Sequence, residues 1–202
     1  MSKDFITSLR PAIVMTLLFA LLLGIVYPLA MTGIGQAVFP EQANGSLIRD
    51  GKGAVIGSTV IGQAFTTDRY FQTRPSAAGK GYDGLASAGS NLGPAAQALT
   101  DRVKADVEKR RGEGVTGAVP ADLVTTSGSG LDPDLSPQAA LAQVARVAKM
   151  RGLPEAQLHD LIDRNIEHPM FGFLGEDHVN VLALNQQLDR QSPGQLAGST
   201  RP

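Results

Sequence analysis

The sequence has no cysteine, which excludes disulfides, thiolate metal sites and cysteine nucleophiles. An excess of charge of one sign is also missing, since 18 basic and 19 acidic residues leave a formal net charge of -1. That balance excludes the basic surface that nucleic-acid binding requires. The chain also lacks G-x-x-x-x-G-K-[ST], G-x-G-x-x-G, G-x-S-x-G and H-E-x-x-H. We therefore expect no catalytic residues and a chain that is not an enzyme.

Metal ligands are equally scarce. The only histidines are His159, His168 and His178, and no two of them are close enough in sequence to share adjacent turns of one helix. We expect no metal site and no tightly bound cofactor.

A long stretch of the chain, from Pro11 to Pro40, contains no charged residue. Its apolar core, residues 12–31, would form a helix of about 30 Å, the thickness of the hydrocarbon layer of a bilayer. Tyr27 fits an interfacial anchor near the outer end, and Pro28 is expected to kink or thin the last turn. The segment therefore predicts a transmembrane helix. A cleaved signal peptide and the buried core helix of a soluble protein are the two alternatives.

Flanking charge predicts the orientation of this helix. Lys3 and Arg10 precede it, and the other flank has no basic residue before Arg49. The positive-inside rule then places residues 1–11 in the cytoplasm and residues 32–190 outside it. Residues 191–202 are polar and predict a disordered tail. The fold class expected is α+β, with a single N-terminal transmembrane helix followed by one extracytoplasmic mixed α/β domain.

Strand and loop signals dominate the first half of that domain. Residues 46–58 predict a hairpin about a D-G-K-G turn, and residues 60–65 predict a further strand. Residues 66–94 are rich in Gly, Ser and Ala and predict a long loop, which in a compact domain is usually functional. Residues 121–130 predict one buried strand.

Helical periodicity is clearest in the second half. Leu99, Val103 and Val107 predict an amphipathic helix that ends at glycines. Residues 136–152 predict another, with Ser136 as its cap, Pro137 at its first position, Gly152 at its end and an apolar stripe of Leu141, Val144, Val147 and Ala148. A third begins at Pro154 and turns Leu158, Leu161 and Ile162 inward. Residues 179–190 predict a short strand or helix.

Two glycine-rich segments are candidates for binding. The first offers an anion the side chains of Arg74, Ser76, Lys80, Ser87, Ser90 and Asn91, although the same composition fits a tightly packed loop in which Asn91 caps the next segment of the chain. Ser76 and Lys80 lack the spacing of S-x-x-K, so a Ser-Lys hydrolase is not favoured.

The second candidate is "SGSGLDPDLSP", residues 127–137, which fits either a phosphate-binding loop or a turn into a helix. We expect free amides at Gly128 and Gly130, positive φ at both glycines, and no cation beside them. Asp132 and Asp134 place negative charge where a phosphate needs positive charge. Those aspartates, and the helix start at Ser136, favour the turn.

Taken together, the blocks "YPLAMTGIGQAVFPEQANGSLI", "GSTVIGQAF", "YFQTRPSA", "SGSNLGP", "VPADLVTTSGSGLDPDLSPQAALAQVARVAKMRGL" and "LGEDHVNVLALNQQLD" resemble the C subunit of the Kdp-type high-affinity potassium-transporting ATPase. They occur in the order of that family and cover nearly all of residues 10–189. The usual pattern "SGSGLDPHIS" carries a histidine that this chain replaces with Asp134. Any role of that histidine is therefore absent here.

The resemblance implies a single-span accessory subunit in an inner-membrane complex. Its partners would be a channel-like potassium-binding subunit (KdpA), a P-type ATP-hydrolysing subunit (KdpB) and a small membrane peptide (KdpF), within the lipid bilayer and without nucleic acid. Potassium would be the transported ion. The family is described as a catalytic chaperone that raises the ATP affinity of the P-type subunit, and "SGSGLDP" resembles the signature loop of ABC ATPases.

Two site hypotheses arise from the resemblance. One is nucleotide binding through Ser127, Gly128, Ser129, Gly130, Leu131 and Asp132, which the expected topology opposes because it puts this loop across the membrane from cytoplasmic ATP. The other is an outer cap over the potassium entrance, where Asp132 and Asp134 raise the local concentration of cations.

Overall fold

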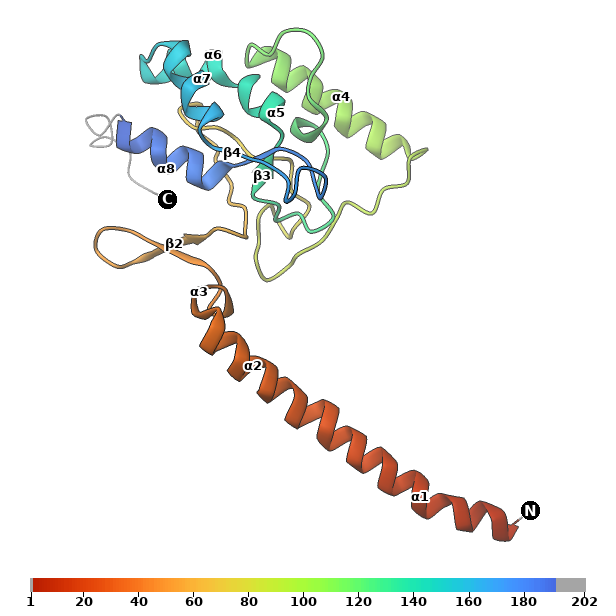
Figure 1. Ribbon diagram of the computed structural model, residues 1–202. Helices are drawn as coiled ribbons and strands as arrows, with labels where there is room; N and C mark the ends of the chain where they lie inside the picture. The colour runs from red at the N-terminus through yellow and green to blue at the C-terminus, as the bar shows by residue number, and fades with distance from the viewer. Residues whose placement is uncertain (1, 192–202) are drawn as a thin grey trace. The chain divides into compact units, whose positions relative to one another are not determined.

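The structure, a computed structural model, describes residues 2–191. It divides into two compact units, one up to Leu47 and one from Ile48 onward. Figure 1 shows the first as a long helix and the second as a mixed domain of helices and extended segments. Residues 192–202 of the predicted tail lie outside the described residues.

The first unit is almost entirely helical. It comprises α1 (Ser2–Leu21), the π turn η1 (Leu22–Val26), α2 (Tyr27–Val38) and the short α3 (Pro40–Ala43). Within it, Thr7–Val38 has a mean hydropathy of 2.5, and none of its most apolar window is buried. A helix of that length is about 48 Å long, more than the hydrocarbon layer requires.

This apolar helix is long enough to span a membrane and indicates a single-pass membrane protein. The buried-core alternative is wrong, because the helix covers no face of a core. The choice between a retained anchor and a cleaved signal stays a prediction, as does the side of the membrane that the domain occupies.

The irregularity expected near Pro28 takes the form of a π turn. The amide of Tyr27 donates to the carbonyl of Leu22, five residues back. Proline has no amide hydrogen, and its ring crowds the carbonyl four residues earlier, here that of Gly24. A wider turn before Pro28 relieves that crowding without ending the helix.

The second unit starts with the predicted hairpin. β1 (Leu47–Arg49) and β2 (Val55–Ser58) form a two-stranded sheet. Its turn is held by the carboxylate of Asp50, which accepts the amides of Lys52 and Ala54, both at 2.9 Å. The hairpin prediction is confirmed.

The strand expected at residues 60–65 is wrong. Only Ile61 makes a bridge there, to Ser58. The amide of Gly62 instead donates to the carbonyl of Leu131 at 2.8 Å. A contact with a residue far away in the sequence therefore replaces the local strand pairing.

A small antiparallel sheet and four helices make up the rest of the core. The strands run in the order β3 (Asp134–Leu135), β5 (His178–Asn180), β4 (Ile166–Glu167), and Val179 pairs with both Leu135 and Ile166. The helices packed around them are α5 (Pro137–Leu141), α6 (Val144–Arg151), α7 (Glu155–Asp163) and α8 (Val181–Gln191). The mixed α/β character is confirmed. Residues 179–190 contain both a strand and a helix.

The amphipathic patterns identified the inward faces correctly. Leu158, Leu161 and Ile162 of α7 are all buried, as are Val144, Val147 and Ala148 of α6. Leu141, the fourth residue of the predicted stripe, ends α5 and is half-buried. α4 (Gln97–Gly112) is the helix expected from Leu99, Val103 and Val107, although those three side chains are only half-buried. Asn91 does not cap it, because the residue before its first turn is Ala96.

The single helix expected over residues 136–152 is two helices, α5 and α6. Its ends are as predicted, since Ser136 Oγ accepts the amide of Ala139 at 3.1 Å and Gly152 takes a left-handed conformation. The break lies at Gln143, whose side-chain amide donates to the carbonyl of Ala139 at 3.2 Å. That carbonyl would accept the backbone amide of Gln143 in a continuous helix. The backbone amide donates to Ala140 instead.

The strand expected at residues 121–130 is also wrong. Ala121–Leu123 form a 3-10 turn, η2, after which Thr125 Oγ1 donates back to the carbonyl of Ala121 at 2.8 Å. Leu123 and Val124 are both buried. The amides of Leu123 and Val124 donate to the carbonyls of Pro120 and Ala121, so local turn bonds replace the strand pairing while both side chains stay in the core.

The long loop, residues 66–94, contains no helix or strand, as predicted. Its first part is nevertheless held firmly by side chains of two helices. Asn185 of α8 accepts the amide and donates to the carbonyl of Phe71, both at 2.9 Å. The side chain of Gln143 likewise accepts the amide of Gln72 at 2.8 Å and donates to the carbonyl of Gln72 at 3.0 Å. These contacts fix the backbone of the two residues that lie shortly before Arg74, and so the position from which the Arg74 side chain extends.

Candidate functional site

Two amides of the candidate loop, residues 127–132, are bonded to serine hydroxyls of the same loop. Ser127 Oγ accepts the amide of Gly130 at 2.9 Å, and Ser129 Oγ accepts that of Leu131 at 3.1 Å. The expectation of a free amide at Gly130 is therefore wrong. A phosphate loop presents such amides outward, whereas here two of them point to the loop's own hydroxyls.

The two glycines of this loop differ. Gly130 has a φ of +66°, and a Cβ there would lie 2.6 Å from the carbonyl oxygen of Ala88 and 2.7 Å from the amide of Ala78. Gly128 has no positive φ, and a Cβ there would meet nothing within 4 Å. The expected positive φ is thus confirmed for Gly130 and wrong for Gly128.

The long loop packs directly on the candidate loop. Ser76 Oγ donates to the carbonyl of Gly130 at 2.6 Å. The carbonyl of Ser129 accepts two hydrogen bonds at 2.9 Å, one from Ser87 Oγ and one from the amide of Ala88. Two hydroxyls proposed as anion ligands are therefore used within the protein. The geometry favours a rigid turn braced by residues 76–88.

A cation does stand beside the loop, contrary to expectation. Arg74 Nη1 lies 2.8 Å from Asp132 Oδ2, and Arg74 Nε donates to the carbonyl of Thr125 at 3.4 Å. Tyr82 fixes the backbone of Arg74 by donating its hydroxyl to the carbonyl at 2.7 Å. The guanidinium neutralises Asp132 and is not free to bind an anion.

Asp132 and Asp134 open onto a groove of about 480 Å³. Its charged lining comes from four separate segments and comprises Arg74, Asp122, Asp132, Asp134, Glu176, Asp177 and His178. The lining therefore contains five carboxylates, one guanidinium and one imidazole. The groove favours cations over phosphates.

Asp134 lies at the centre of this charge. Burial raises the pKa of its carboxyl, and Asp132 and Glu167 raise it further, against lowering effects of His178 and of a hydrogen bond from Asn180. That bond joins Asn180 Nδ2 to Asp134 Oδ1 at 3.1 Å. Burial is thus the main cause of the raised pKa, and the neighbouring charges act in both directions.

Sequence reasoning found two of the five groove carboxylates. It missed Asp122, which lies just after Pro120 and accepts the amide of Ser136 at 2.6 Å, and it missed Glu176 and Asp177 before β5. The only signal for these was the block "LGEDHVN", which served as a family marker. Among residues 2–191, no three acidic or histidine side chains are placed to hold a metal ion.

Comparison with known proteins places these features in one family. Residues 9–190 match the family described as "KdpC: K+-transporting ATPase, c chain". The "Potassium-transporting ATPase KdpC subunit" of Caulobacter vibrioides (strain NA1000 / CB15N) is 55% identical over 188 residues, covering 93% of this chain and 95% of the relative. Proteins of the same name from Caulobacter sp. (strain K31) and Myxococcus xanthus are 53% and 52% identical, covering 96% and 95% of this chain and 100% and 90% of the relatives.

Proposed function

The chain belongs to the KdpC family of potassium-transporting ATPase subunits, and from this premise we propose that it assembles or stabilises the pump and modulates ATP use by the P-type subunit. It does so as an accessory subunit without catalytic residues. Its partners are the channel-like subunit KdpA, the P-type subunit KdpB and the small peptide KdpF, in the inner membrane.

The observation that carries this proposal is the pairing of one exposed apolar helix with a domain whose polar groups serve its own fold. Thr7–Val38 offers a membrane partner 32 residues of unburied apolar surface. Two serine hydroxyls of the long loop donate to carbonyls of the candidate loop, and two serine hydroxyls of the candidate loop accept amides of that same loop. Such an arrangement suits a chain that binds and braces a partner.

Removal of the chain tests the proposal. The other pump subunits are expressed with and without it, solubilised gently and compared for complex recovery and for potassium-dependent ATPase activity over a range of ATP concentrations. We expect a loss of intact complex or a raised KM for ATP, restored by the chain. A complete complex with unchanged ATP dependence would overturn the proposal.

A second function is favoured by the acidic groove. The domain acts as an extracytoplasmic cap that raises the potassium concentration near the entrance of the channel-like subunit. The five carboxylates gathered in one groove support this role.

Neutralising the groove tests the cap. The double variant Asp134→Asn, Glu176→Gln leaves the Asp132 pair with Arg74 intact. We expect a raised KM for potassium at low ionic strength, with kcat unchanged and the difference reduced by added salt. Asp160→Asn, on the exposed face of α7, is the matched control. An equal KM in all three proteins would exclude the cap.

Direct nucleotide contact through Ser127–Asp132 is not supported. The amides of Gly130 and Leu131 are bonded within the loop, and the carboxylates of the adjacent groove disfavour a phosphate. The topology prediction adds a further objection, which reporter fusions after Asp50 test. A reporter active only outside the cytoplasm would separate the loop from cytoplasmic ATP.

A further inference from the structure

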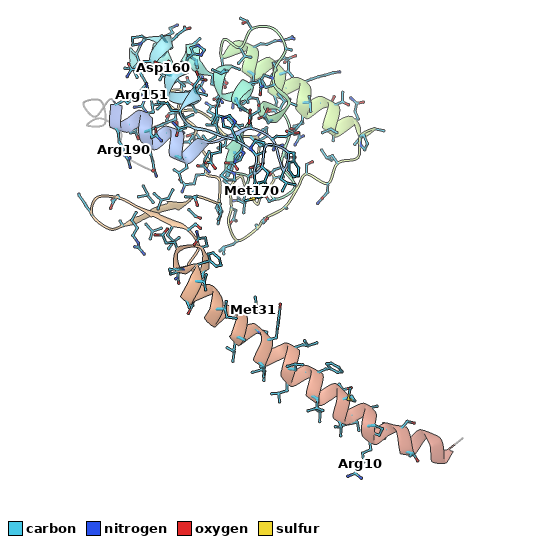
Figure 2. All side chains as sticks on the ribbon, in the orientation of Figure 1. Arg10, Met31, Arg151, Asp160, Met170 and Arg190 are labelled. Atoms are coloured by element: carbon cyan, nitrogen blue, oxygen red, sulfur yellow. The ribbon has the colours of Figure 1, made fainter. Side chains whose placement is uncertain are left out.

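The connection between β4 and β5 exposes four large apolar side chains close together in the sequence. Met170, Phe171, Phe173 and Leu174 are 66%, 79%, 74% and 57% exposed. Figure 2 labels Met170 well apart from Arg151, Asp160 and Arg190 of the helices. Contiguous exposed apolar residues with a polar border are typical of interaction sites. We refer to residues 170–174 as the apolar tip.

The apolar tip is an ordered loop. Its base is closed by His168 Nδ1 and Asp177 Oδ1 at 2.7 Å. The amide of Leu174 donates to the carbonyl of Met170 at 3.1 Å, and these two residues form a bridge. The rings of Phe171 and Phe173 stack with their centroids 6.3 Å apart. Two rigid aromatic side chains on a closed loop are suited to act as anchors in a partner's pocket.

Charge around the tip distinguishes the possible partners. Glu167, Glu176 and Asp177 border it and are exposed, and residues 166–180 contain no Lys or Arg. Segments that insert into a membrane surface usually carry basic residues beside their apolar ones, and anionic lipid would repel this border. A second copy of the chain would bring two acidic borders together.

We propose that the apolar tip docks into an apolar recess with a basic rim on another subunit of the pump, on the side of the membrane where the domain lies. The stacked phenylalanines fill the recess, and Glu167 and Glu176 of the acidic border pair with the rim, while Asp177 stays with His168 at the base of the loop. This inference rests on the proposed function, because it requires the chain to be part of the complex.

A fluorescent label at position 173 tests the docking. The chain has no cysteine, so Phe173→Cys can be labelled with the environment-sensitive dye NBD at that position alone. Leu85→Cys, at a fully exposed apolar residue elsewhere in the domain, is the matched control. Each labelled full-length chain is placed in nanodiscs that contain brominated phosphatidylcholine, first alone and then assembled with the other pump subunits.

We expect the emission at position 173 to shift to shorter wavelength only on assembly, without quenching by brominated lipid, while position 85 stays unchanged. Quenching in the chain alone would overturn the proposal in favour of lipid contact. A shift that depends on the concentration of the chain alone would overturn it in favour of self-association. An unchanged spectrum in an intact complex would refute docking but leave the proposed function standing. If the unaltered chain does not assemble at all, both fail.

A second measurement removes the anchors. Phe171→Ser with Phe173→Ser leaves the fold intact, since neither ring is buried. We expect this variant chain, without any label, to dissociate from the assembled complex about tenfold faster than the unaltered chain, the effect typical of losing an aromatic anchor. Leu85→Ser is the control, and equal dissociation rates for the two variants would contradict the proposal.

Discussion

At the scale of single residues, Gly130 is the position in the candidate loop whose identity the backbone requires. Its positive φ disfavours any L side chain, and the carbonyl of Ala88 and the amide of Ala78 leave no space for a Cβ. Gly128, two residues earlier, has neither constraint. The loop therefore depends on one glycine of its two.

We predict that Gly130→Ala lowers the free energy of unfolding by about 2 kcal/mol, from the left-handed backbone and the close contacts. Gly128→Ala should change it by less than about 0.5 kcal/mol. Thermal melts of the full chain in detergent, followed by circular dichroism, make the comparison. Equal losses in the two variants would show that composition rather than conformation matters.

Asp134 makes stability depend on pH. Because burial raises the pKa of its carboxyl in the folded state, the folded state binds the proton more tightly than the unfolded state. The stabilising contribution is complete below the ordinary value of 3.8 and is lost as pH rises through the higher folded value. At neutral pH the ionised carboxylate is a cost.

We predict that Asp134→Asn raises the Tm at pH 7 and that the gain shrinks as the pH falls toward 3.8. The substituted amide keeps an oxygen to accept the hydrogen bond from Asn180. Melts of both proteins across this range measure the difference. A gain that grows toward low pH would contradict the assigned direction.

At the scale of elements, the extended segment 70–74 is attached by side-chain amides in place of a neighbouring strand. Asn185 and Gln143 each form a pair of hydrogen bonds with one of its residues. Gln143 also accounts for the break between α5 and α6. One side chain thus ends a helix locally and fixes a distant loop.

We predict that Asn185→Leu lowers the free energy of unfolding by about 3 kcal/mol, because the amide and carbonyl of Phe71 are left buried without partners. Gln186→Leu, the next residue of α8, is the control, since its side-chain nitrogen is buried without a hydrogen-bond partner in the structure. It should be neutral or stabilising. Urea unfolding of both variants provides the test, and an equal loss would assign the effect to the helix.

At the scale of the whole molecule, the hydrophobic core belongs to the second unit alone. Its buried members run from Phe71 to Leu188. No residue of Thr7–Val38 contributes a buried side chain. The membrane helix and the domain are therefore expected to be separable in folding.

We predict that residues 48–191 fold without the apolar helix and melt within about 5 °C of the full chain, since less than about 1 kcal/mol of folding energy should be lost. The readouts are circular dichroism and dispersion of amide signals in nuclear magnetic resonance. A truncated chain that stays unfolded in water would show that the helix stabilises the domain.

Local features were predictable because their causes are local. The apolar run, the Ser136 cap, the Gly152 end and the inward face of α7 each depend on residues within a few turns of one another. Family membership was also predicted correctly from the ordered motif blocks. These properties were determined by the sequence itself.

Tertiary structure decided what depends on contacts between distant residues. The amide of Gly62 bonds to the carbonyl of Leu131 and not to a neighbouring strand. The side chain of Gln143 bonds to the backbone of Gln72, and the helix is interrupted at the same residue. Arg74 reaches Asp132 from a distant part of the chain, so the loop that looked free of cations carries one. The acidic groove draws its carboxylates from separate segments. Periodicity reports the pattern along a chain, whereas the partner of each polar group is chosen only when the core brings the segments together.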